Sequence, residues 1–145
     1  MLENIYCDTL IYQRLASDST FVAALGGQRI YRYRAPQTGG HPDCYYRLID
    51  SEDFNSGNRQ GRLIVRAAYE IGVRSEGFPT EAAKTAAHRL DELWRMNRRV
   101  SFTVGAVTLS FNSWRVALRP INEPGSTPDK FYIGNGALYE FEIFS

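Results

Sequence analysis

The sequence is poor in the residues on which most catalytic and metal sites depend. Its 145 residues include only two histidines, His41 and His88, and two cysteines, Cys7 and Cys44. Nucleophilic catalysis needs a base near a serine or cysteine. His41 stands three residues before Cys44, but no second motif supports such a pair. The four residues also lack the C-x-x-C and H-x-x-x-H spacings of zinc sites. We therefore expect no enzyme, no metal and no cofactor.

Long apolar runs are missing as well. No segment approaches the ~20 apolar residues that cross a bilayer. The N-terminal segment MLENIYCDTL carries Glu3 and no basic residue, which is unlike a secretory signal. The composition, 43% hydrophobic and 13% aromatic, is that of an ordered protein. We expect a single domain over residues 1–145, made in a cytoplasm, without membrane contact and with reduced cysteines.

Lysine is scarce among the basic residues. Only Lys84 and Lys130 accompany fifteen arginines, and the formal net charge is +1. So small a net charge argues against nucleic-acid binding through bulk positive charge. Arginine forms bidentate pairs that tolerate partial burial, and protein interfaces are enriched in arginine and depleted in lysine. The bias indicates a protein interface, the codon usage of a GC-rich genome, or both.

Local patterns predict an α+β fold. Helices are expected at 3–16, at 20–25 after the cap residues Ser17 and Asp18, and from Thr80 to about Arg99. Gly26-Gly27 ends the second helix. Strands are expected at 29–34, 44–51, 62–71, 100–104, 107–118 and 137–144, with loops at 35–43, 52–60 and 120–129 and a turn at 134–136. Together these form an antiparallel or mixed sheet of about five strands, with two long helices on one face and a short helix near the N-terminus.

The first helix is apolar on most of its sides. Such a helix is usually covered on more than one side, and in a small protein the second cover can be another subunit. This is a first indication of oligomerisation.

Arginine and tyrosine alternate along the predicted strands. Strand periodicity places Arg32 with Arg34 on one face, and Arg62 with Arg66 on one face. With Tyr31, Tyr33, Tyr45 and Tyr46, these arginines can form a stacking surface for single-stranded nucleic acid, a protein interface or a solvated sheet face. The sequence leaves the three readings open.

The order of elements in residues 10–36, LIYQRLASDSTFVAALGGQRIYRYRAP, followed by PDCYYRL at 42–48, resembles the tail terminator (tail completion) proteins of long-tailed, lambda-like phages. The resemblance also includes residues 78–93 and the final strand at 139–143. It rests on the order of elements rather than on an invariant motif.

The resemblance implies a structural virion protein at the head-proximal end of the tail, assembled in the host cytoplasm. It would form a ring of six copies that caps the tail tube, ends tail elongation and meets the head-tail connector, with nucleic acid at most passing through the lumen. The subunit or tube contacts are then expected among ten residues: Tyr31, Arg32, Tyr33, Arg34, His41, Phe54, Asn58, Arg59, Arg62 and Arg66. The alternatives are a head-completion or neck protein and, from a different class, a single-stranded nucleic-acid-binding module.

Overall fold

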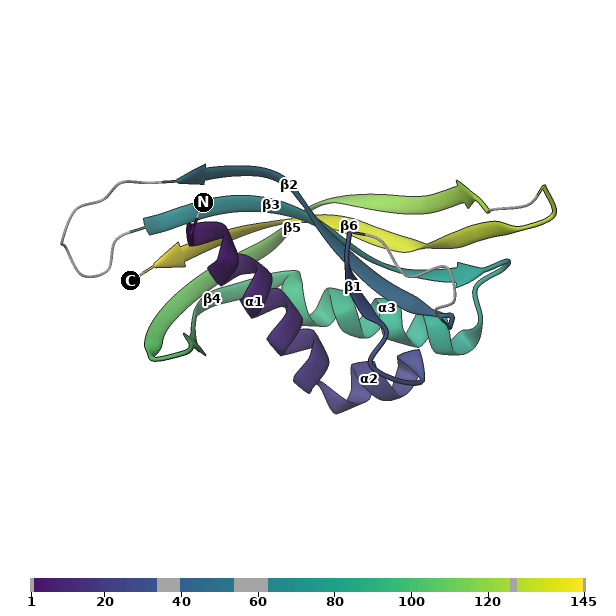
Figure 1. Cartoon of the computed structure of the whole chain (residues 1–145), viewed down its shortest axis with the longest axis horizontal. Helices are drawn as coiled ribbons and strands as arrows, with labels where there is room; N and C mark the ends of the chain where they lie inside the picture. Colours follow the sequence, from purple (N-terminus) through teal and green to yellow (C-terminus); the bar gives the residue numbers. More distant parts are fainter. Residues whose placement is uncertain (1, 34–39, 54–62, 126–127, 145) are drawn as a thin grey trace.

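Six strands form one curled sheet, and three helices lie on one of its faces (Figure 1). The computed structural model describes residues 2–33, 40–53, 63–125 and 128–144. Its helices are α1 (Leu2–Ser17), α2 (Ser19–Leu25) and α3 (Glu81–Trp94). Its strands, in sheet order, are β1 (Ile30–Arg32), β2 (Asp43–Asp53), β3 (Leu63–Glu76), β6 (Phe131–Phe144), β5 (Val107–Pro124) and β4 (Met96–Val104).

The sheet is mixed, as expected. β1 runs parallel to β2, and every other pair of neighbours is antiparallel. The described residues contain six strands where about five were expected. β2 and β3 are direct antiparallel neighbours in this sheet.

Predicted caps set the ends of the helices. Asp18 precedes α2 and accepts a hydrogen bond from the backbone nitrogen of Phe21 at 2.8 Å. Gly26 ends α2 in the left-handed conformation, with φ at 81°, which glycine adopts without strain. Thr80 caps α3 by accepting a hydrogen bond from the nitrogen of Ala83 at 3.1 Å. These three signals were legible in the sequence, and each is confirmed.

The end of α3 was predicted wrongly. The helix was expected to continue to about Arg99, but it ends at Trp94 with Arg95 as its C-cap, and β4 begins at Met96. Asn97 explains the early end, since its side-chain nitrogen donates to the carbonyl of Leu93 and to the hydroxyl of Ser113, both at 2.7 Å. Pairing with β5 therefore draws this segment into the sheet.

The predicted loop at 120–129 was wrong for residues 120–124, and the predicted turn at 134–136 was wrong throughout. Residues 120–124 continue β5 and pair with β6, and residues 134–136 lie inside β6. Prolines are tolerated at this end of β5 because β4 pairs only with residues 107–114, so the outer side of β5 is free of ladder bonds there. Gly136 serves close packing: a Cβ atom at this position would lie 3.2 Å from the Tyr45 hydroxyl.

The core lies between the sheet and the helices. In β3 the alternate residues Val65, Ala67, Tyr69, Ile71 and Val73 are buried, as their period of two predicted. Hydrogen bonds tie the helices to this face: the Tyr69 hydroxyl donates to Asp8 of α1 at 2.6 Å, and the Tyr139 hydroxyl donates to Asp91 of α3 at 2.8 Å.

The fully buried Trp94 packs edge-on against Phe141, with ring centroids 5.3 Å apart. Cys7 and Cys44 are buried and form no disulfide, as expected. No helix in the described part of the chain has the length and apolarity that a membrane span requires.

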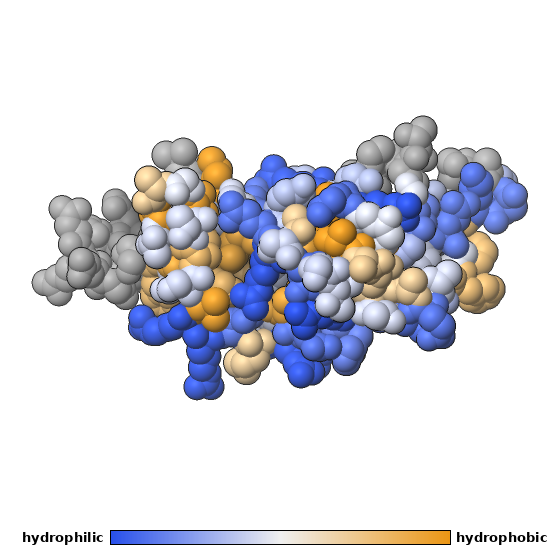
Figure 2. Space-filling view, turned by 90° about the horizontal axis from the view of Figure 1, so that it is seen from below, coloured by the Kyte–Doolittle hydropathy of each residue, from blue (hydrophilic) through white to orange (hydrophobic). Residues whose placement is uncertain are grey.

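Only one side of α1 is covered. Cys7, Leu10, Ile11 and Leu15 are buried, whereas Ile5 and Tyr12 are 52% and 45% exposed. Figure 2 looks onto the helices and shows hydrophobic residues lying between hydrophilic ones on this side. That a second subunit covers the remaining apolar residues of α1 stays a prediction.

Candidate functional site: the helix-free face of the sheet

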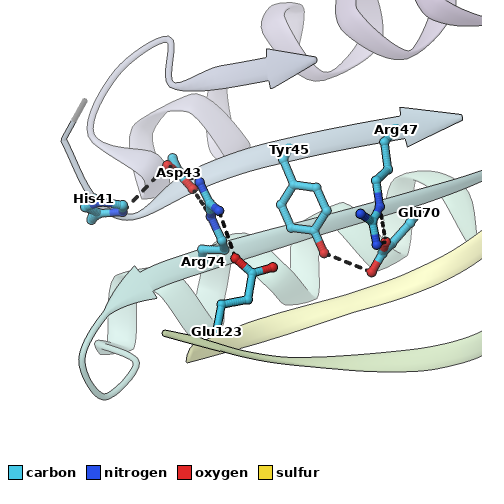
Figure 3. Close-up of polar contacts among 7 residues, drawn as sticks. All are labelled: His41, Asp43, Tyr45, Arg47, Glu70, Arg74 and Glu123. Carbon is cyan, nitrogen blue, oxygen red and sulfur yellow. Dashed lines mark hydrogen bonds and ion pairs between the residues drawn. The ribbon is translucent and has the colours of Figure 1, made fainter. Parts of the chain in front are cut away.

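The face of the sheet away from the helices carries a row of charged side chains (Figure 3). They come mainly from β2 and β3, and the strongest contacts join residues that are direct partners in the strand register. Asp43 stands opposite Arg74, and Arg47 stands opposite Glu70. On the next pair of strands Arg66 stands opposite Glu142. Opposite charges placed in this way stabilise a sheet across its strands.

Arg74 is the centre of the first cluster. Its Nε and Nη2 donate to the two carboxylate oxygens of Asp43 at 3.2 and 3.3 Å, and its Nη1 donates to Glu123 of β5 at 3.2 Å. Asp43 is fully buried. Burial alone lowers the pKa of Arg74, but the hydrogen bonds and charge of Asp43, followed by those of Glu123, raise it overall. Arg74 therefore keeps its positive charge, and its hydrogen bonds to the buried Asp43 pair the two groups.

Glu70 joins Arg47 and Tyr45 in a second cluster. Arg47 forms an ion pair with Glu70, and the Tyr45 hydroxyl donates to the other carboxylate oxygen at 3.2 Å. Burial raises the pKa of Tyr45, and the charge of Glu70 raises it further. The tyrosine therefore stays a neutral donor over the whole physiological range.

Two glycines allow these side chains to lie flat on the sheet. Gly72 and Gly136 are register partners on β3 and β6. A Cβ atom on Gly72 would lie 3.0 Å from Ile121 Cδ1, and one on Gly136 would lie 3.2 Å from the Tyr45 hydroxyl. Tyr45 and Ile121 thus pack against the two glycines. This packing explains why the Tyr45 and Ile121 side chains are each only 5% exposed, although no helix covers this face.

This arrangement forms a rigid polar surface. The charges of the two clusters are paired within the chain. Both cysteines, Cys7 and Cys44, are buried, and burial raises the pKa of their thiols. His41 lies 3.6 Å from Asp43 and packs on the ring of Tyr132. Within the described ranges no three histidine, cysteine or acidic side chains gather as metal ligands do.

The structure places the predicted contact residues on different surfaces. Arg32 lies on the helix side, where its Nη2 lies 2.7 Å from Oδ2 of Asp8 in α1. Its guanidinium carbon lies 4.7 Å from the ring centroid of Tyr33. Arg66 lies on the helix-free side and pairs with Glu142 at 3.0 Å. Tyr31 is the register partner of Tyr45.

The prediction grouped these residues as one set, and the structure does not bring them together. The predicted residues Arg34, Phe54, Asn58, Arg59 and Arg62 lie outside the described residues, as do most of the two loops at 35–43 and 52–60.

Two of the four tyrosines proposed as a stacking surface, Tyr45 and Tyr46, are not available for it, whereas Tyr33 is 49% exposed. Tyr45 and Tyr46 are each 5% exposed and point to opposite faces of β2. Burial, aided by the charge of Asp8, raises the pKa of Tyr46 to about 12. Neither ring can stack on a base without leaving its packing.

The charged clusters were missed from the sequence. The alternation Asp43, Tyr45, Arg47 on one strand and Glu70, Gly72, Arg74 on the next was a usable signal. Reading it required the register of β2 against β3, which the alternation of apolar residues does not determine by itself.

The comparisons with known proteins give a likeness of fold. No protein-family model matches the sequence, and no curated protein does. A similar solved structure is a chain of the "Virion of native gene transfer agent (GTA) particle". The likeness covers 93% of this chain and 92% of that chain, with a TM-score of 0.55 and 18% identity. At this identity the likeness shows a shared fold over almost the whole length of both chains.

Proposed function

We propose that the protein is a structural component of a phage-like virion. The observation that carries the proposal is the agreement of fold with a chain of a gene transfer agent virion, over 93% of one chain and 92% of the other. The order of elements that resembles tail terminators is consistent with it. A face of internally neutralised charges and buried cysteines fits a structural role better than an enzymatic one.

Within that class we propose a tail terminator. A ring of copies, six by the resemblance, would cap the tail tube, stop its elongation and present a surface to the head-tail connector. Exposed apolar residues on α1, Ile5 and Tyr12, support contact between neighbouring copies. Arg32 and Arg66 remain proposed contacts on two different sides of the subunit.

Deletion of the reading frame tests the proposal, with particles imaged by negative stain. A terminator predicts abnormally long or frayed tails beside unattached filled heads. Tails of normal length beside defective heads would move the protein to the neck, as a head-completion protein. Intact particles would contradict a virion role in assembly. Complementation by the wild-type gene is the control, because it must restore tail length.

A further inference from the structure

The two edges of the sheet differ in charge. At one edge lies β4, and no charged residue occurs from Val100 to Trp114 along β4 and the adjoining part of β5. This hairpin gives the area with little blue at the left of Figure 2. Natural edge strands usually carry charge or proline to prevent pairing with other chains. The uncharged part of β4, from Val100 to Val104, is therefore suited to such pairing.

Two arginines stand where β4 begins. Arg98 and Arg99 are exposed and occupy an irregularity in the pairing between Asn97 and Val100. Arg99 has φ at 45°, and its guanidinium lies 5.1 Å from the ring centroid of Phe144. In the described part of the chain, neither guanidinium has a carboxylate within ion-pair distance. This edge therefore offers unneutralised positive charge beside a bare strand.

The opposite edge is acidic. β1 pairs only with residues 44–46 of β2, so among the described residues no strand covers the outer side of residues 47–53. Asp50 and Glu52 are exposed there. They line a hollow of about 220 Å³ on the helix-free side together with Glu140 and Arg66. Among the described residues, three carboxylates and one arginine line the hollow, so these groups give it a negative charge that complements an arginine.

We infer that β4 of one copy pairs with residues 47–53 of β2 in the next copy. The strands would extend one sheet into the next, and Arg98 or Arg99 would enter the acidic hollow beside Asp50 and Glu52. Because the two edges are different surfaces, the contact is head-to-tail and generates a ring when the rotation closes. The inference deepens the proposed function, on which the closing of the ring rests, by naming the surfaces that join neighbouring copies.

Charge reversal at each edge tests the pairing. One variant carries Arg98→Glu and Arg99→Glu, a second carries Asp50→Arg and Glu52→Arg, and a third carries all four changes. Each is compared with wild type for complementation of the deletion strain and for the mass of the purified protein across a range of concentrations. Arg119→Glu is the matched control, since Arg119 is exposed on β5 but belongs neither to β4 nor to residues 47–53 of β2. Circular dichroism and thermal melting verify that each variant folds. If the paired changes impair folding, Arg98→Glu alone is used.

Each reversal at one edge should lower the yield of tail-complete particles at least tenfold and weaken association of the purified protein. The variant with all four changes should restore the particle yield and the association of the purified protein. Arg119→Glu should change neither quantity. Wild-type assembly by the one-edge variants would overturn the inference while leaving the proposed function intact. Failure of the exchange to restore assembly would also overturn it, because the two edges would then meet other partners. If the deletion itself proves harmless, the proposed function fails, and the mass measurement alone decides the edge contact.

Discussion

The two faces of the sheet show how the same strands support two kinds of chemistry. On the helix-covered face, β3 presents buried apolar residues and one tyrosine bonded to a helix carboxylate. On the other face, the alternate residues of β3 are Arg66, Glu70 and Arg74, each paired with a residue of a neighbouring strand. The helix-covered face forms the hydrophobic core. The helix-free face forms a polar surface on which these three charges are paired across neighbouring strands. If this contrast is right, substitutions on the two faces should differ in their cost to folding.

The largest expected loss is on the covered face, at Trp94. Its fully buried ring packs against Phe111 and Phe141. Trp94→Ala should lower the free energy of unfolding by about 3–5 kcal/mol, because it removes this contact and leaves a cavity. Urea denaturation measures the change. Leu118→Ala is the control, because Leu118 is 68% exposed and should cost almost nothing. Equal effects at the two positions would contradict the assignment of the core.

A somewhat smaller loss is expected from the helix-free face at Asp43. Asp43→Ala removes the bidentate partner of Arg74 and should cost about 3 kcal/mol, because a half-buried guanidinium loses its main acceptor. Replacing both Asp43 and Arg74 by leucine should recover most of that loss, since no unpaired buried charge then remains and Glu123, which also loses Arg74, is 51% exposed. Urea denaturation of the single and double variants gives the coupling free energy between Asp43 and Arg74. A double variant no more stable than Asp43→Ala would show that the pair is not the source of the effect.

An intermediate loss is expected within the helix layer, at Asp18. Its carboxylate caps α2 and also accepts hydrogen bonds from Arg89 of α3 at 2.6 and 3.1 Å. Asp18→Ala should cost about 1–2 kcal/mol through loss of the cap. Asp18→Asn keeps the cap, so it should cost less. Thermal melting of the two variants separates the cap from the ion pair.

The contribution of Asp18 to stability should also depend on pH. The hydrogen bonds from Arg89 lower the pKa of Asp18 below its ordinary value. Its contribution is therefore complete above about pH 4 and is lost as the pH falls through the lowered pKa. The difference in the free energy of unfolding between wild type and Asp18→Asn should therefore shrink as the pH falls below about 4. A difference that stays constant down to pH 2 would contradict the linkage.

The smallest effect on folding is expected at Arg66. Its pair with Glu142 is exposed, with the arginine side chain 46% accessible. Arg66→Ala should therefore change stability by at most about 1 kcal/mol. As a proposed contact residue, it should nevertheless reduce particle assembly in the complementation assay. A variant that melted like wild type and assembled like wild type would remove Arg66 from the proposed contacts.

Local signals predicted the fold well where they act alone. The caps at Asp18 and Thr80, the glycine at the end of α2 and the alternation in β3 were read correctly because each depends on neighbours in sequence. Long-range pairing produced the errors. Asn97 bonds to Ser113 and begins a strand where basic residues suggested a helix end, and Gly136 lies inside a strand because Tyr45 packs over it.

The candidate site was predictable only in part. Arg66 was singled out from strand periodicity, but its partner Glu142 is 76 residues away. The clusters around Arg74 and Glu70 depend on which residue of β2 stands opposite which residue of β3, and a bulge between Leu48 and Asp50 shifts that register. Sequence periodicity assigns residues to a face but does not align one strand with another.

The most direct test of the central claim is a cryo-electron microscopy reconstruction of the head–tail joint of intact particles. If the protein is a tail terminator, a closed ring of copies of this fold should lie on the last ring of the tail tube. If the sheet edges pair, β4 of each copy should lie against β2 of the next. A joint without this fold, or the fold at another position in the particle, would contradict the proposed function. A ring at the joint with both sheet edges unpaired would contradict the edge contact alone.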